Sequence, residues 1–66
     1  MSQFASVPPL AVDPEEAGRI SGHSRSAIYM AIAKGDLESF KSGRRRLILI
    51  TQLHTWLNRL AKENAR

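Results

Sequence analysis

Residues 13–29 read DPEEAGRISGHSRSAIY and hold two helix starts separated by one glycine-containing turn. Asp13 is suited to cap the first helix because its carboxylate accepts hydrogen bonds from free backbone N–H groups. Pro14 suits the first helical position, where its missing N–H costs nothing. Ser21-Gly22 stops this helix after about two turns. The quoted stretch therefore predicts one short helix and the start of a second.

The second helix is predicted to begin after Ser24 and to end at Gly35, where a left-handed residue is usually needed. Its apolar residues Ile28, Ala31 and Ile32 recur at i, i+3 and i+4, which gives one face that packs against the rest of the protein. Because the connection between the helices is short and contains a glycine, we expect the two helices to meet at a steep angle.

The other face of the second helix is suited to reading DNA. Held at a steep angle, this helix can enter the major groove, which is about 12 Å wide, while the first helix braces it. Arg25 can pair with guanine edges or with phosphate, Ser26 is short and adaptable, and Tyr29 offers a ring and a hydroxyl. The predicted recognition residues are Ser24, Arg25, Ser26, Tyr29 and Met30. An ordinary helical hairpin with a solvated polar face is the alternative at this point.

Two short β-prone runs, residues 37–41 and 46–50, are separated by Ser42-Gly43-Arg44-Arg45 and predict a β-hairpin. Its tip carries a cluster of cations with no acid among them. The cluster consists of Lys41, Arg44, Arg45 and Arg46, four of the ten lysines and arginines in a chain of formal net charge +4. Such a patch is typical of a phosphate binder, although a solvated charge run is the alternative. If all four cations met phosphates, log affinity would fall with log salt at a slope of about −3 to −4.

A third helix is predicted after Thr51, and it carries the largest apolar stripe of the chain. The stripe consists of Leu53, Trp56, Leu57 and Leu60. Residues 10–12 can form a very short strand. With 66 residues there is room for one domain. The predicted fold is α+β and mostly α: a winged helix-turn-helix with three helices and a two-stranded hairpin as the wing. We expect a flexible N-terminal arm at 1–9, the domain at 10–62 and a fraying tail at 63–66.

The second run of the hairpin is unusually apolar. Alternation puts Ile48 and Ile50 on one face of the strand and Leu47 and Leu49 on the other. One face covers the core, so the other needs a partner. We hypothesise that Leu47 and Leu49 form a contact between protomers. The alternative is that Phe4, Val7 or Leu10 of the same chain folds over them.

Several classes of function lack the residues they need. The chain has no cysteine and only two histidines, so neither a disulfide nor a metal site is expected. No catalytic triad, phosphate-binding glycine loop or pair of catalytic carboxylates can be assembled, so we predict a non-enzymatic protein without cofactors. No run approaches the roughly 20 apolar residues of a membrane span.

Residues 10 to about 60 resemble the MerR-like winged-helix domains of phage excisionases, also called recombination directionality factors, and look most like those of mycobacteriophages. The resemblance rests on the order and spacing of Leu10-Ala11-Val12, Glu16-Ala17, Gly22, Ser24-Arg25-Ser26, Ile28-Tyr29, Gly35, Leu37, Lys41, Gly43-Arg44-Arg45-Arg46, Ile48 and Leu53. The chain departs from the family at Gly18, Ser21 and His23, where Ala, Leu and Val are usual. A glycine within a helix costs roughly 1 kcal/mol relative to alanine, and losing the leucine thins the packing under the turn.

The resemblance implies an architectural role. Excisionases bind double-stranded DNA near the phage attachment site as several cooperating protomers and bend it, which lets the phage integrase run excision. It also implies that the protein works in the cytoplasm of the bacterial host. By position, Arg25, Ser26 and Tyr29 would face the major groove, and residues 44–46 would sit on the wing.

Two other functions are considered. A small MerR-like transcriptional regulator would use the same fold and residues, but it usually adds an effector domain or a long dimerising helix, and this sequence ends about one turn after Leu60. A protein-interaction module would dock through the third helix or the Leu47/Leu49 face. The affinity of such a module for its partner would not depend on salt concentration or on the arginine cluster, whereas the affinity for DNA falls steeply as salt rises.

Overall fold

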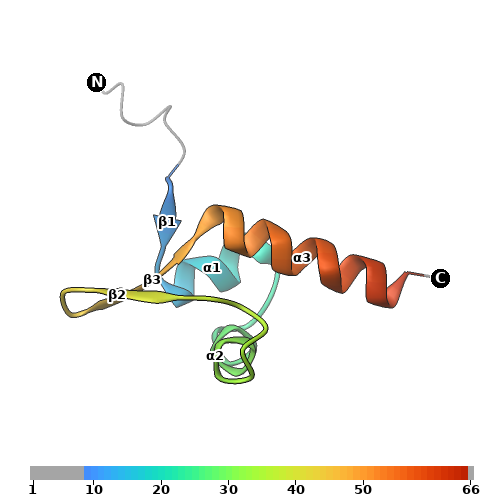
Figure 1. Cartoon of the computed structure of the whole chain (residues 1–66), viewed down its shortest axis with the longest axis horizontal. Helices are drawn as coiled ribbons and strands as arrows, with labels where there is room; N and C mark the ends of the chain where they lie inside the picture. The colour runs from blue at the N-terminus through green and yellow to red at the C-terminus, as the bar shows by residue number, and fades with distance from the viewer. Residues whose placement is uncertain (1–8, 66) are drawn as a thin grey trace.

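The computed structural model describes residues 9–65 of the chain. The elements follow in the order β1 (Ala11–Val12), α1 (Pro14–Ser21), α2 (Arg25–Ala33), β2 (Phe40–Ser42), β3 (Arg45–Leu49) and α3 (Ile50–Asn64). The hairpin of β2 and β3, called the wing below, and helix α3 project in opposite directions from the packed helices α1 and α2 (Figure 1). Residues 1–8 of the predicted arm, including Phe4 and Val7, lie outside the described residues.

Helix α1 begins and ends where its sequence predicts. The Oδ1 atom of Asp13 accepts a hydrogen bond from the backbone N–H of Glu16 at 2.8 Å, and Gly22 closes the helix with a left-handed backbone at φ 78°. On the exposed side, Arg19 donates to both carboxylate oxygens of Glu16. These hydrogen bonds lower the pKa of Glu16 below its ordinary value.

Helix α2 also follows its local signals. The Ser24 hydroxyl accepts a hydrogen bond from the N–H of Ala27 at 3.0 Å. Gly35 has a φ of 82° in the turn directly after the helix. Ile28 and Ala31 are buried, and Ile32 packs against the core from a partly buried position, so the predicted apolar face is confirmed.

The sheet has three antiparallel strands in the order β1-β3-β2, which are the predicted hairpin and the very short strand predicted at residues 10–12. Ala11 pairs with Leu49 and Val12 with Ile48, so the short strand β1 fixes the base of the wing. Ser42 pairs with Arg45, which leaves a two-residue turn of Gly43 and Arg44 rather than the predicted four-residue connection. Gly43 has a φ of 64°, as the first central position of a type II′ turn requires.

Three boundaries predicted from the sequence were wrong. Leu37 is a buried core residue before the sheet, not a strand residue. Ile50 begins α3 instead of ending β3, so Thr51 lies inside the helix and Leu49 occupies the cap position without a side-chain hydrogen bond. The helix continues to Asn64, past the predicted start of the tail at residue 63.

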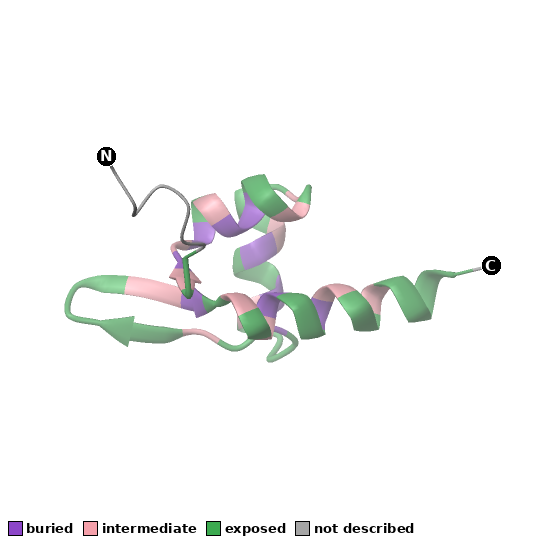
Figure 2. Cartoon of the chain, turned by 90° about the horizontal axis from the view of Figure 1, so that it is seen from above, coloured by how far each residue is buried: buried purple, intermediate pink, exposed green. Residues whose placement is uncertain are grey.

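The core lies where the helices meet the inner face of the sheet. Buried residues gather along α1, α2, β3 and the first half of α3, while the far end of α3 is exposed (Figure 2). The core consists of Val12, Ala17, Ile28, Ala31, Leu37, Ile48, Leu53 and Trp56. The protein is thus an α+β, mostly helical winged helix-turn-helix, as predicted. Within residues 9–65, no helix has the length and apolar character needed to cross a membrane.

Candidate nucleic-acid interface

The turn between α1 and α2 packs against Gly18, a glycine inside α1. A Cβ atom on Gly18 would lie 2.8 Å from the carbonyl oxygen of His23 and 3.3 Å from the carbonyl carbon of Ser24. Real Cβ atoms essentially never approach backbone atoms so closely. The sequence analysis treated Gly18 only as a residue that weakens the helix. In the structure it also has a packing role, because its missing side chain lets the turn pack directly on α1.

His23 adds a contact beneath the same turn. Its ring centroid lies 4.9 Å from that of Trp56, with the rings tilted by 49°, and its Nδ1 atom lies 3.0 Å from the carbonyl oxygen of Ser21. Aromatic packing of this kind stabilises the position of both rings. The packing that the missing leucine at Ser21 was expected to thin is thus supplemented by the contact between His23 and Trp56 of α3.

Replacing Gly18 with alanine is expected to lower the free energy of unfolding by about 1–2 kcal/mol. The overlap with the turn costs about 1–3 kcal/mol, and the better helix propensity of alanine returns up to about 1 kcal/mol. Chemical denaturation monitored by circular dichroism measures the change. Arg19→Ala in the same helix is the control, and equal or greater stability of the Gly18→Ala protein would show that the turn does not need this close approach.

The outer face of α2 is exposed to solvent within the part of the chain that the structure describes. Arg25, Ser26, Tyr29 and Met30 are all exposed, and Met30 keeps 64% of its surface accessible. The guanidinium carbon of Arg25 lies 5.3 Å from the centroid of the Tyr29 ring, a cation–π geometry that holds the two side chains together. Ser24 is also exposed, and its hydroxyl is used for the helix cap.

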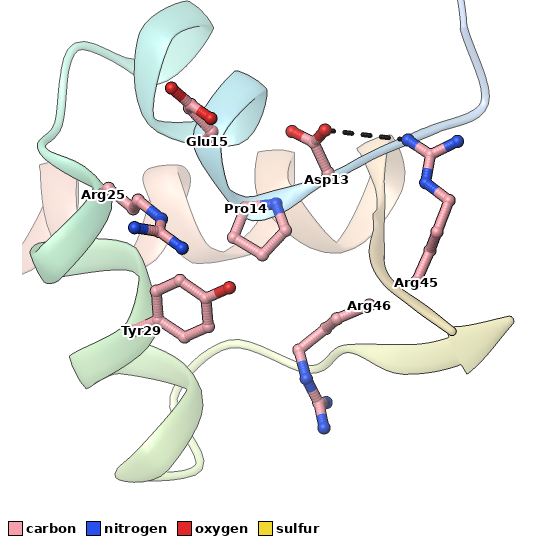
Figure 3. A pocket seen from close by; sticks show the side chains of 7 residues that line it. All are labelled: Asp13, Pro14, Glu15, Arg25, Tyr29, Arg45 and Arg46. Atoms are coloured by element: carbon pink, nitrogen blue, oxygen red, sulfur yellow. Dashed lines mark ion pairs between the residues drawn. The ribbon is translucent and has the colours of Figure 1, made fainter. Parts of the chain in front are cut away.

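A groove of about 220 Å³ lies between the outer face of α2 and the wing (Figure 3). It is lined by Asp13, Pro14, Glu15, Arg25, Tyr29, Arg45 and Arg46. Arginines from two segments far apart in the sequence therefore border one hollow. The start of α1, with its two carboxylates, forms the wall between them.

The four cations of the wing differ in their surroundings. Arg45 Nη2 lies 3.6 Å from Asp13 Oδ2, and Arg46 Nη1 donates to the Ser39 hydroxyl at 2.6 Å. Lys41 and Arg44 are exposed, and no carboxylate of residues 9–65 lies within 4.0 Å of their charged groups. The sequence analysis did not distinguish these four cations. In the structure Arg45 and Arg46 contact other side chains, so Lys41 and Arg44 are the most accessible to an anion from outside the protein.

The acidic side of this groove was missed by the sequence reasoning. Asp13 was assigned only as a helix cap, and Glu15 was not among the predicted site residues, although both line the groove. No local sequence pattern predicts that Asp13 lies beside the wing, because this contact forms only when β1 pairs with β3. Among residues 9–65, no group of three or more potential metal-ligating side chains is found.

The outer face of the sheet carries an apolar cluster. Phe40 pairs with Leu47 across the wing, and Leu49 lies two residues further along the same face. Phe40 and Leu49 are exposed and Leu47 is half-buried. Phe40 was not part of the predicted Leu47/Leu49 pair. Phe40 and Leu49 also line a second hollow of about 210 Å³ with Glu38, Ser39 and Gln52.

Comparison with protein families and known proteins identifies a family. A family model described as a helix-turn-helix domain matches residues 11–61, which include both short helices, the wing and most of α3. No curated protein and no solved structure matches the chain.

Proposed function

Because the chain belongs to the helix-turn-helix domain family, whose members bind DNA, we propose that it binds double-stranded DNA through α2 and the wing together. The observation that carries this proposal is the common groove, which Arg25 and Tyr29 of α2 share with Arg45 and Arg46 of the wing. One duplex can therefore contact both elements at once. In many DNA-binding proteins a recognition helix lies in the major groove while a basic element contacts the neighbouring phosphate backbone.

Within this proposal the residues have distinct roles. Ser24, Arg25, Ser26, Tyr29 and Met30 face the major groove, where Arg25 pairs with a guanine edge or a phosphate. Met30 supplies an exposed apolar surface on the same helix face, suited to thymine methyl groups. Lys41, Arg44, Arg45 and Arg46 contact phosphates or enter a narrow minor groove.

We further propose that the protein acts as an excisionase. The helix-turn-helix family that it belongs to includes excisionase-like proteins, and the spacing of the Ser-Arg-Ser and Gly-Arg-Arg-Arg motifs supports this identity. In this role, protomers bind side by side at a phage attachment site, bend the DNA and direct the phage integrase to excision. A single module buries only about 600–1,000 Å². Bending 20–30 base pairs costs about 1–6 kcal/mol, so several protomers are needed to offset it.

The decisive experiment is a gel-shift titration on random-sequence and attachment-site DNA at about 50 and about 200 mM salt. With four phosphate contacts, the affinity for random DNA is expected to fall about 100-fold between these salt concentrations. Stepwise, cooperative shifts that favour the attachment site, with mobility that depends on the position of the site in the fragment, would support the excisionase role. Tight binding without bending or cooperativity would favour a transcriptional regulator instead. Binding to neither DNA would overturn the proposal and favour a protein-interaction module.

The apolar cluster on the sheet is proposed as the contact between neighbouring protomers. Replacing Leu47 and Leu49 with serine is expected to abolish cooperative binding while leaving the affinity of the first protomer within about 3-fold, because the cluster lies outside the groove. The measurement is the Hill coefficient on DNA that holds several sites, together with sedimentation of the free protein.

The control for this variant is Ile20→Ser. Ile20 on α1 is 46% exposed, close to the 41% of Leu49, and lies outside the sheet. Since Leu47 is half-buried, Leu49→Ser alone is measured as well. Unchanged cooperativity in both Leu variants would refute the protomer contact.

A further inference from the structure

Asp13 uses its two carboxylate oxygens for different purposes. Oδ1 accepts the N–H of Glu16 at 2.8 Å and caps α1. Oδ2 lies 3.6 Å from Nη2 of Arg45, in the strand that leads back from the tip of the wing. Figure 3 shows the Arg45 guanidinium directed at Asp13, whereas the guanidinium of Arg46 points to the opposite side of its strand.

An exposed ion pair of this kind can be displaced by a phosphate of DNA. A guanidinium has a fixed fork of donors that suits a carboxylate and a phosphate equally. The pair is open to solvent, with 68% of the Arg45 side chain and 44% of the Asp13 side chain exposed, so a phosphate can approach and replace the carboxylate. After a phosphate has taken its place at Arg45, the Asp13 carboxylate still caps α1, so its negative charge stays close to that phosphate and repels it.

We infer that Asp13 weakens binding to DNA in general by occupying Arg45, so that the Asp13–Arg45 pair is an autoinhibitory contact on the DNA-binding surface. The inference rests on the proposed DNA-binding function. A duplex gains the Arg45 contact only by displacing Asp13, so the cost of displacement lowers the affinity for every duplex, whatever its sequence.

The test compares Asp13→Asn with the wild-type chain on random-sequence duplex DNA. Asparagine keeps a side-chain oxygen for the cap but removes the charge that holds Arg45. The variant is expected to bind random DNA about 3-fold more tightly, the size of effect typical of an exposed ion pair. The preference for the attachment site over random DNA is expected to stay unchanged, because both duplexes must displace the same ion pair. A thermal midpoint within about 4 °C of the wild type would show that the cap is intact.

Two further variants isolate the pair. Glu15→Gln removes the same charge from the same groove, but no ion pair joins Glu15 to the wing within residues 9–65; it is expected to change affinity by less than about 1.5-fold. In an Arg45→Gln background, Asp13→Asn is expected to have no effect. The carboxyl-carbon NMR signal of Asp13 in the wild-type chain gives an independent readout, which is expected to shift when random DNA is added.

The outcomes separate the two proposals. If the wild-type chain binds no DNA, the proposed function itself fails. If the wild-type chain binds but Asp13→Asn binds equally or more weakly, Asp13 positions Arg45 for DNA or plays no part, and the inference is wrong. Equal gains in Asp13→Asn and Glu15→Gln would also overturn it, since general charge would then be the cause.

Discussion

Replacing Arg44, Arg45 and Arg46 together with alanine is expected to weaken binding to random-sequence DNA about 100-fold at about 0.1 M salt. Each lost phosphate contact removes about 0.9 from the slope of log affinity against log salt, so the slope should become shallower by about 2 to 3. The slope falls by the full amount only if Arg45 leaves Asp13 and Arg46 leaves Ser39 in the complex. Fluorescence anisotropy titrations at several salt concentrations give both the affinity and the slope.

The matched control removes three charges elsewhere. Arg19, Lys34 and Lys62 are exposed and do not line the groove, so replacing them with glutamine changes the net charge equally. This control is expected to lose less than about 3-fold in affinity, because exposed charges separated by more than the Debye length of about 10 Å are largely screened. Equal losses in the two variants would show that the wing is not a specific contact.

Replacing Ile28 with alanine is expected to lower the free energy of unfolding by about 3–4 kcal/mol. Ile28 is 0% exposed and belongs to the core cluster, and removing a buried isoleucine side chain costs about 2–5 kcal/mol. A domain of this size is stable by only about 3–10 kcal/mol. The variant should therefore lose from about a third to all of its stability and bind DNA less well, because α2 carries the proposed recognition face. Urea denaturation followed by circular dichroism measures the change.

Ile32 is the internal comparison, since it lies one turn later on the same face but is only partly buried. Ile32→Ala is expected to cost about 1 kcal/mol, in proportion to the smaller apolar area that it removes from water. Similar losses at both positions would mean that α2 is not anchored mainly through Ile28.

Local signals in the sequence determined the ends of the two short helices. Asp13, Ser24, Gly22 and Gly35 act through the backbone groups of the nearest turn, and the structure shows these caps and left-handed glycines where they were predicted. The weakest local prediction was the junction of β3 and α3. No side-chain cap forms there, so packing of the apolar helix stripe decides where the strand ends.

The candidate recognition face could also be predicted from the sequence, because helical periodicity alone separates Arg25, Tyr29 and Met30 from the buried face of α2. The same reasoning could not rank the cations of the wing. Arg44 and Arg45 are neighbours in the sequence, yet only Arg45 has a carboxylate partner among residues 9–65.

The sequence by itself thus determined the number and order of the helices and the basic hairpin, since each depends on short-range patterns of polarity, charge and turn residues. Only the tertiary structure decided that Gly18 lies against the His23 carbonyl, that a third strand fixes the wing, and that Asp13 meets Arg45. These contacts join segments through packing and strand pairing. Their distances depend on how the whole core closes, which no local pattern encodes.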